Sequence, residues 1–175
     1  TINAFRTLAL NGGTLNTGNL VNNGSFVFDS GTLGITGAGG LTVGTGGALG
    51  ATVNVAAGQT INVTNTTTVA ASGTLVVGDG QFNALGGLVN NGEVRLAGAA
   101  PRLVGGAITN NKLVRGDGRI DNNFTNAATG EIRAEAGDTL LFTGANGANA
   151  GRISLQGGTV QFSQGLTNAA GGIIA

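Results

Sequence analysis

The sequence predicts an all-β protein built as a right-handed parallel β-helix, or β-solenoid, of about eight coils with three short strands each and no helices. Three observations predict this fold. A nine-residue unit that joins a turn to a short strand recurs along the chain. Its copies are separated by multiples of about 16 to 23 residues, the length of one solenoid coil. Glycine supplies 35 of the 175 residues, and the tight corners of stacked coils need positions without a Cβ.

The repeating unit is clearest at residues 88–96, which read LVNNGEVRL. Two asparagines and Gly92, which is expected to adopt a positive φ, form the turn. In the strand that follows, Val94 and Leu96 fall on one side and two charged residues on the other. Related copies read LVNNGSFVF at 20–28, ITNNKLV at 108–114, FTNAATGEIRA at 124–134 and LTNAAGGIIA at 166–175.

Apolar residues recur at alternate positions in short segments about seven to eight residues apart, which predicts strands separated by turns. The first turn is expected at Asn11-Gly12-Gly13, and the pattern is cleanest between residues 52 and 77. Helical repeats are disfavoured because each interior Gly would cost roughly 0.8–1 kcal/mol. In chain order, the apolar residues that mark the strands are Leu8, Leu10, Leu15, Phe26, Phe28, Leu33, Ile35, Leu41, Val43, Val53, Val55, Ile61, Val63, Val69, Leu75, Val77, Val94, Leu96, Leu103, Ile108, Leu113, Ile120, Ile132, Leu140, Phe142, Ile153, Leu155, Val160, Phe162, Ile173 and Ile174.

In a parallel solenoid, each strand hydrogen-bonds to the equivalent strands of the coils above and below it, and similar side chains stack in columns. Stacked asparagines can then bond to one another along the axis. The candidates for such ladders are Asn22-Asn23, Asn90-Asn91, Asn110-Asn111 and Asn122-Asn123. We expect residues 1–175 to form one solenoid segment of a longer stack, whose open ends would favour self-association.

Composition excludes several classes of function from this segment. The chain has no Cys or His, so thiolate and imidazole metal sites and Ser-His or Cys-His catalysis are absent, and we expect no metal and no cofactor. Eight basic and eight acidic residues give zero net charge, so nucleic acid is not an expected partner. The apolar runs are only a few residues long, so this segment is not expected to insert into a membrane.

The G-G-x-apolar and N-N-G-x-apolar-x-apolar runs, with A-G-D-T-L-L-F at 136–142, resemble the β-solenoid regions of large bacterial surface proteins. These are autotransporter passenger domains, autotransporter-associated strand repeats and filamentous-haemagglutinin-like exoproteins. The resemblance covers nearly the whole chain and implies a rod or stalk of an adhesin that is secreted or exposed at the bacterial cell surface. It implies no catalytic residues, and the amino-terminal cap and membrane-anchoring barrel of those proteins are not in this sequence.

Charge is concentrated between Glu93 and Asp138, where six acidic and six basic residues lie. This segment could be a face that recognises a glycan or a host cell-surface protein, although charged side chains on a strand usually only solvate its outer face. The candidate binding residues are Arg115, Asp117, Arg119, Asp121, Glu131 and Arg133.

Two other kinds of site are weighed at residues 115–121, RGDGRID. A pectin-lyase-like polysaccharide-degrading enzyme would need two or three clustered carboxylates, which Asp117 and Asp121 supply only if Glu131 or Asp138 joins them. Calcium-binding β-rolls repeat an aspartate motif in coil after coil, and one copy flanked by arginines matches them poorly. We therefore expect the chain not to be an enzyme.

Overall fold

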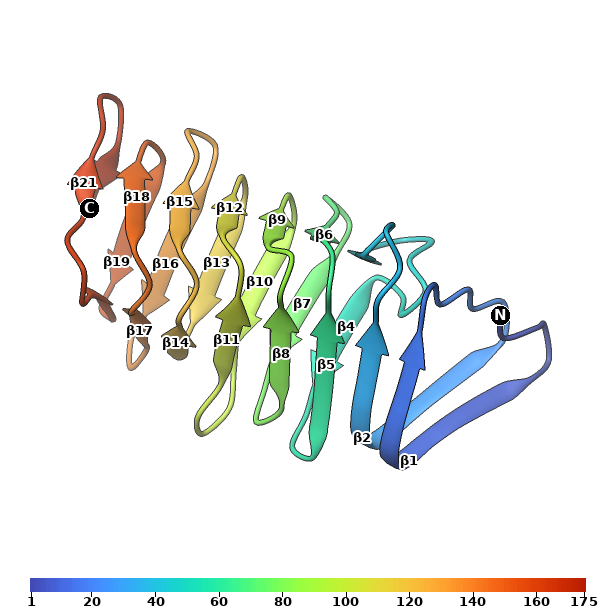
Figure 1. Cartoon of the computed structure of the whole chain (residues 1–175). Helices are drawn as coiled ribbons and strands as arrows, with labels where there is room; N and C mark the ends of the chain where they lie inside the picture. Colours follow the sequence, from blue (N-terminus) through green and yellow to red (C-terminus); the bar gives the residue numbers. More distant parts are fainter.

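The computed structural model describes residues 1–175, apart from the side chain of Asn146. All its regular elements are β-strands, arranged in three parallel sheets that wind into a solenoid of about eight coils, as the sequence predicts. Figure 1 shows the coils stacked side by side from the N-terminus to the C-terminus. Each regular coil passes through the three sheets in turn, so its strands pair with the coils before and after it.

We name the sheets by number. Sheet I contains β1 (Thr7–Thr17), β2 (Ser25–Ile35), β5 (Gln59–Val63), β8 (Gln81–Ala84), β11 (Arg102–Gly105), β14 (Gly118–Ile120), β17 (Thr139–Phe142) and β20 (Thr159–Phe162). Sheet II contains β4 (Thr52–Val55), β7 (Thr74–Val77), β10 (Glu93–Leu96), β13 (Leu113–Gly116), β16 (Glu131–Glu135), β19 (Arg152–Gln156) and β22 (Ile173–Ile174). Sheet III contains β3 (Leu41–Val43), β6 (Thr67–Val69), β9 (Leu88–Asn90), β12 (Ile108–Asn110), β15 (Phe124–Asn126), β18 (Asn146–Asn149) and β21 (Thr167–Asn168).

The register shows how long each coil is. Ile61 pairs with Phe82, and Phe82 pairs with Leu103, so two successive coils have 21 residues each. Leu33 pairs with Ile61, so the coil between them has 28 residues. This longer coil contains a glycine-rich loop at residues 44–50, closed by a hydrogen bond of 3.1 Å from Gly44 N to Gly50 O.

The core is a narrow apolar column between the three sheets. Alternate residues of each strand point into it, which explains the period of two in the sequence. Val94, Ile132 and Leu140 are at most 1% exposed, which confirms their predicted inward positions. Toward the C-terminus, aromatic rings continue the column, with centroids 4.7 Å apart for Phe124–Phe142 and 4.9 Å apart for Phe142–Phe162.

The corner glycines have two different physical causes. Gly116 has φ of +103°, a conformation that favours glycine, and a Cβ there would lie 2.0 Å from the carbonyl oxygen of Leu96. The expectation of a positive φ at Gly92 is wrong. Gly92 lies outside the left-handed region, and glycine is needed there because a Cβ would lie 2.2 Å from the carbonyl oxygen of Ala70 in the preceding coil. Close stacking of coils, rather than backbone conformation, therefore selects this glycine.

The predicted turn at Asn11-Gly12-Gly13 is present as a bend within β1, where Gly12 and Gly13 have positive φ and the pairing with β2 shifts register. One strand expectation is corrected. Leu155 is 44% exposed, because the alternation in β19 breaks where Ile153 and Ser154 are both buried. This irregularity of β19 moves Leu155 away from the inward side that a period of two would give it.

Thr67 in β6 is an inward polar side chain in the apolar column. It is fully buried, and its hydroxyl oxygen has no hydrogen-bond partner among the described residues. Because Val has nearly the same shape without the hydroxyl, we expect Thr67→Val to raise the free energy of unfolding by about 1 kcal/mol. Urea unfolding measures this effect, with Thr68→Val on the partly exposed side of the same strand as the control. A destabilised Thr67→Val variant would contradict the inward placement of this hydroxyl.

Candidate functional site

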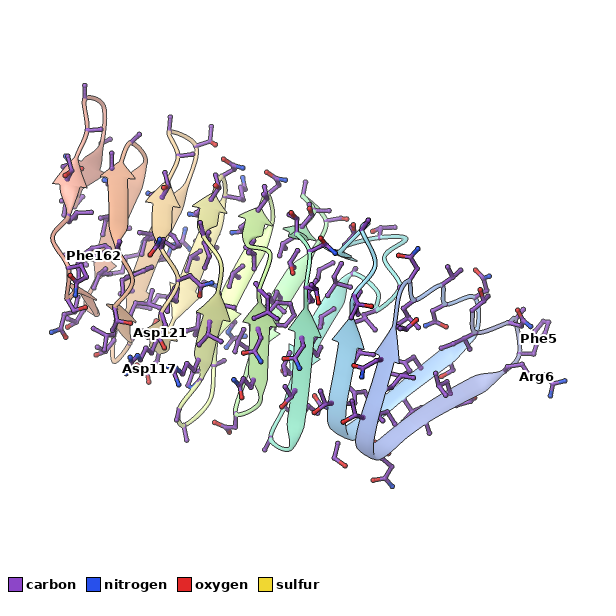
Figure 2. All side chains as sticks on the ribbon, viewed as in Figure 1. Phe5, Arg6, Asp117, Asp121 and Phe162 are labelled. Atoms are coloured by element: carbon purple, nitrogen blue, oxygen red, sulfur yellow. The ribbon has the colours of Figure 1, made fainter. Side chains whose placement is uncertain are left out.

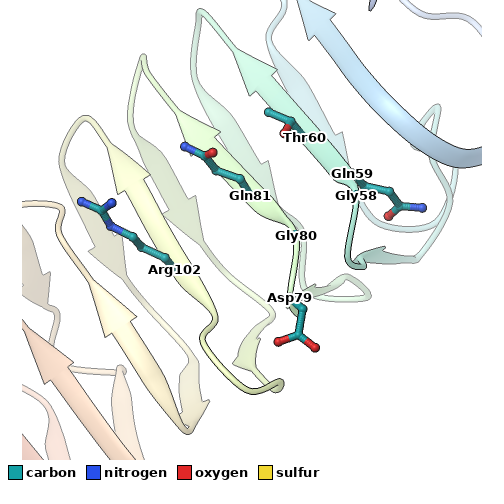
Figure 3. Close-up of a pocket in the computed structure, with 7 residues that line it drawn as sticks. All are labelled: Gly58, Gln59, Thr60, Asp79, Gly80, Gln81 and Arg102. Atoms are coloured by element: carbon teal, nitrogen blue, oxygen red, sulfur yellow. The ribbon is translucent and has the colours of Figure 1, made fainter. Parts of the chain in front are cut away.

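Two adjacent grooves lie on the outer side of sheet I. The first has a volume of about 380 Å³ and is drawn in Figure 3, where its lining side chains come from successive coils. The second has a volume of about 370 Å³ and shares Arg102 with the first. It also contains Asp117 and Arg119, two of the candidate binding residues. On the outer side of sheet I, predicted binding residues therefore line a groove.

An ion cluster at these grooves centres on Asp121. Its carboxylate accepts hydrogen bonds from the guanidinium groups of Arg102 and Arg119 and from the hydroxyl of Thr143. Partial burial raises the pKa of Asp121, but the three hydrogen bonds together lower it more, so the pKa lies below its usual value of 3.8. Asp121 is thus held as an anion between two cations from different coils.

This arrangement has a pH-dependent consequence. A depressed carboxyl pKa adds stability above the pKa of the unfolded chain, and this contribution is lost as pH falls through the lower folded-state value. We expect Asp121→Asn to lower the melting temperature at pH 7 and to lower it less at about pH 2.5. Thermal unfolding at both pH values measures this difference. An equal loss at both would show that the charge of Asp121 does not stabilise the fold.

Asp117 is engaged separately, at the corner between β13 and β14. Its Oδ1 accepts a hydrogen bond of 2.9 Å from the backbone N of Thr139 in the next coil. Asp138, at the equivalent corner of that coil, accepts a hydrogen bond of 3.0 Å from the backbone N of Glu135. Figure 2 shows Asp117 and Asp121 on the same side of the stack. Asp117 and Asp138 therefore act as turn-stabilising acceptors, while Asp121 holds the ion cluster.

The other candidate residues lie on the outer side of sheet II. Arg115 pairs in register with Arg95 and with Arg133, so three arginines form a column across three coils. We call these three residues the arginine column. Arg115 Nε lies 2.8 Å from Glu93 Oε1 in the preceding coil. Arg133 binds Glu131 through two nitrogens, at 3.0 and 2.9 Å.

The glutamates explain how three arginines can lie side by side. The hydrogen bond from Arg133 to Glu131 raises the pKa of Arg133 above its usual range, although burial opposes it, and the charges of Glu131, Glu135 and Glu93 add to the effect. Repulsion within the column is offset by the flanking carboxylates. Arg115 and Glu93 therefore form an ion pair between stacked coils.

The six candidate residues thus divide between two sheets. Arg119 and Asp121 lie with sheet I, Asp117 lies at a corner, and the other three lie on sheet II. Sequence reasoning did not include Arg102 and Arg95 in the set. Arg102 joins Asp121 across coils 19 residues apart, and Arg95 joins the column by register. Among the described residues, no group of three or more carboxylates could hold a metal ion.

A second site, internal to the stack, is built from asparagines of sheet III. The buried Nδ2 of Asn90 donates to Asn110 Oδ1 at 2.7 Å, and Asn110 donates to Asn126 at 2.8 Å. Asn126 then donates to Asn149, and Asn149 to Asn168, each at 2.7 Å. We call these five residues the asparagine ladder. It runs along the solenoid axis and joins five coils through side chains alone.

The predicted ladders are therefore confirmed in part. Asn90 and Asn110 are rungs, and Asn111 also donates to Asn91 Oδ1 at 2.9 Å on the outer side of the same corner. Asn22 bonds instead to the carbonyl of Ala48, at 3.1 Å. Asn122 bonds to a backbone carbonyl, and Asn123 accepts from a backbone N. The rungs at Asn126, Asn149 and Asn168 were missed, although the TN dipeptides of the repeating unit mark two of them.

Comparison with known proteins gives no assignment. A scan against protein-family models and searches of curated proteins and of solved structures each found no match. Among the described residues, no helix has the length and apolar character that a membrane crossing requires. The functional interpretation of the chain therefore depends on its own geometry.

Proposed function

We propose that this chain is a structural rod segment of a secreted or surface-exposed bacterial protein, of the adhesin or autotransporter-passenger kind. In this role the stack holds apart the regions attached at its two ends. The proposal includes no catalytic residue, so we expect no turnover of acidic polysaccharides. Depolymerisation of polygalacturonate that is lost in Asp121→Asn would contradict this expectation.

The observation that carries the proposal is the continuity of the stack along its axis. From β7 to β22, every strand of sheet II pairs with the strand of the preceding coil. The asparagine ladder adds a second connection through Asn90 to Asn168, and the aromatic rings near the C-terminus continue the core. A load applied at one end is thus shared by three ladders of backbone hydrogen bonds and by the core.

The charged side chains also support a structural role. Glu93 and Arg115 join neighbouring coils, Asp121 joins Arg102 to Arg119, and Asp117 fixes the backbone of the next coil. Exposed ion pairs contribute only about 0–1 kcal/mol each, but these fix the register between coils. The pairs thereby oppose sliding of one coil over the next.

Deletion of whole coils tests the proposal. Val94 pairs with Val114, so removing residues 94–113 deletes one coil and keeps the register. We would place the chain between an epitope and an outer-membrane barrel and measure antibody binding to intact cells. We expect full epitope exposure with the whole chain and with the one-coil deletion. Deletion of residues 94–103 removes half a coil and should abolish exposure, because it puts inward residues of later strands out of phase.

Either of two results would contradict the rod. The epitope could remain inside the cell with the intact chain, or it could reach the surface equally well after the half-coil deletion. The first result would contradict the proposed location at the cell surface. The second would show that epitope exposure does not require the stacked fold. Circular dichroism of the three purified chains separates loss of export from loss of folding.

A second candidate function is favoured by the arginine column. Strands about 4.8 Å apart present Arg95, Arg115 and Arg133 as a row of cations on the outer side of sheet II. Such a row could bind an acidic glycan or an acidic face of a host protein. We expect Arg95→Ala to reduce retention on immobilised polygalacturonate, with Arg152→Ala, an exposed residue of the same sheet, as the control. Equal retention of both variants and the wild type would remove this candidate.

Self-association through the open ends remains part of the proposal. Phe5 and Phe162 lie at opposite ends of the stack (Figure 2), and at the C-terminal end Ile173 and Ile174 are 51% and 52% exposed. Exposed strand edges with apolar neighbours favour end-to-end contact. Sedimentation of the isolated segment over a range of concentrations should show reversible association, and Ile174→Lys should weaken it. A concentration-independent monomer would contradict this part.

A further inference from the structure

Two strands near the N-terminus each have one edge without a strand partner, and the two edges face each other. SFVF at 25–28 corresponds in the repeating unit to EVRL at 93–96, so the first half of β2 occupies the place of a sheet II strand. It pairs with residues 7–10 of β1 on one side. The next sheet II strand, β4, pairs with β7. Among the described residues, residues 25–28 and β4 do not pair with each other.

The repeating unit places these two strands in neighbouring coils. Asn22 Oδ1 accepts the N of Gly24 at 3.1 Å, as Asn90 Oδ1 accepts the N of Gly92 at 3.1 Å, so the turn before residues 25–28 has the regular form. In Figure 1 the first halves of β1 and β2 nevertheless splay away from the rest of the stack. The space between has a volume of about 160 Å³, and its apolar lining consists of Phe26, Phe28, Leu49, Val53 and Ile61. We call this space the strand slot.

At one end of the strand slot, the side chain of Gln59 bridges the two walls. Its Nε2 donates to the carbonyl of Phe28, and its Oε1 accepts the N of Ala56 at 2.8 Å. In the regular coils the equivalent groups bond directly, as Gly78 N bonds to Val55 O at 3.0 Å. One amide group therefore lies where the two coils would otherwise meet. A β-strand inserted between them would place one peptide amide at the same position, with N–H and C=O facing the same ways.

The backbone groups that face the slot follow from the pairing on the other sides. In a parallel strand, alternate residues direct both N–H and C=O to the same neighbour. The carbonyl of Val55 faces β7, and the backbone N of Ala56 faces Gln59. The backbone N–H and C=O groups of Thr52 and Asn54 therefore face the slot. On the other wall, the backbone N of Ser25 bonds to the carbonyl of Arg6. The backbone groups of Phe26 therefore face the slot, as the carbonyl of Phe28 does. Donors and acceptors are thus available on both walls of an apolar space.

We propose that the strand slot binds one extended peptide strand of another polypeptide, inserted parallel to residues 25–28 and to β4. The backbone of this strand bonds to both walls, and its inward side chains complete the apolar column. The preferred peptide is uncharged and has a β-branched residue at every second position, as β4 itself does. A volume of about 160 Å³ suits such side chains, because an apolar cavity of about 150 Å³ accommodates a benzene-sized group.

The test uses a capped, fluorescein-labelled peptide of sequence Thr-Val-Asn-Val and the whole chain. Anisotropy reports binding, and hydrogen exchange reports its position. We expect slower exchange at Phe26 and Asn54 when the peptide is present. A peptide N-methylated at every amide should bind at least about tenfold more weakly, because it lacks the donors.

The matched variants are Asn54→Pro and Asn54→Ala. Both remove an exposed side chain, but only proline removes the N–H that faces the slot, and the bonds between β4 and β7 do not use that N–H. We expect Asn54→Pro to lower the affinity about tenfold and Asn54→Ala to leave it within about twofold. Circular dichroism shows whether both variants fold. If Asn54→Pro does not fold, the comparison of the N-methylated and unmethylated peptides still tests whether binding uses backbone hydrogen bonds.

Three results would overturn the proposal. The peptide could fail to bind at millimolar concentration. It could bind with protection at Ile173 and Ile174, which would place it on the terminal edge of sheet II instead. The amides of Phe26 and Asn54 could also be fully protected without peptide, which would show that residues 25–28 close directly onto β4.

Discussion

Replacing Ile132 by Asp is expected to lower the free energy of unfolding by about 4 kcal/mol or more. Ile132 is 1% exposed and lies between Val114 and Ile153 in the sheet II column. The substitution removes packed methylene groups and places a carboxylate where the neighbouring strands offer only apolar side chains. Urea unfolding at pH 7 measures the loss.

The matched control is Arg133→Ala, one residue further along β16. Arg133 points outward and binds Glu131 at a partly exposed surface, so its removal should cost at most about 1 kcal/mol. The contrast between adjacent residues tests which side of the strand faces the core. Equal losses for the two variants would contradict the assigned inward and outward sides.

Replacing Asn126 by Asp is the second change with a large expected effect. Asn126 Nδ2 donates to Asn149 Oδ1 at 2.7 Å and to the carbonyl of Arg152 at 3.1 Å, and its Oδ1 accepts from Asn110. A carboxylate cannot donate, so it would face two buried oxygens without a hydrogen between them. We expect a loss of about 3 kcal/mol at pH 7, as for other buried charges left without a partner.

The pH dependence distinguishes the ladder from a general effect of substitution. In the Asn126→Asp variant, burial among acceptors raises the folded-state pKa of the introduced carboxyl group, so its protonated form, which can donate, is favoured in the fold. The loss should therefore shrink as pH falls from 7 toward about 4. Asn111→Asp, in the outer pair with Asn91, should cost less than about 1 kcal/mol at either pH. A pH-independent loss at Asn126 would argue against hydrogen bonding between the rungs.

Much of the fold could be predicted from the sequence because each strand carries its own period-two pattern. Val53 and Val55, or Val94 and Leu96, show their inward sides without reference to any other coil. The repeating unit also fixes where corners fall between sheet III and sheet II. Local patterns thus decide the class of fold, the strand positions and the core.

The asparagine ladder shows what local patterns leave out. Its rungs are 20, 16, 23 and 19 residues apart, because the loops between strands differ in length from coil to coil. Sequence alone places Asn90 beside Asn110 through the shared NNG-like motif, but Asn149 occurs without that motif. Its position follows only from the register of the paired strands.

The charged segment illustrates the same limit. Proximity in sequence groups residues 93–138 as one charged face, but the chain turns between sheets II and I at Gly116 and Asp117. Arg115 and Arg119 therefore lie on different sheets, four residues apart. The strand slot was also outside the reach of sequence analysis, since the unit at 20–28 looks as regular as the unit at 88–96. The splayed first halves of β1 and β2 break the stacking without breaking the sequence pattern.

The central claim is that successive coils lie directly over one another, and distances between spin labels test it most directly. The chain contains no Cys, so labelled pairs can be introduced cleanly at the outward-facing residues Thr52, Glu131 and Arg152. Register places Thr52 four coils from Glu131 and five from Arg152. At about 4.8 Å per coil we expect roughly 19 Å between the backbones of the first pair and roughly 24 Å between those of the second. Two equal distances, or a second distance shorter than the first, would contradict the stack.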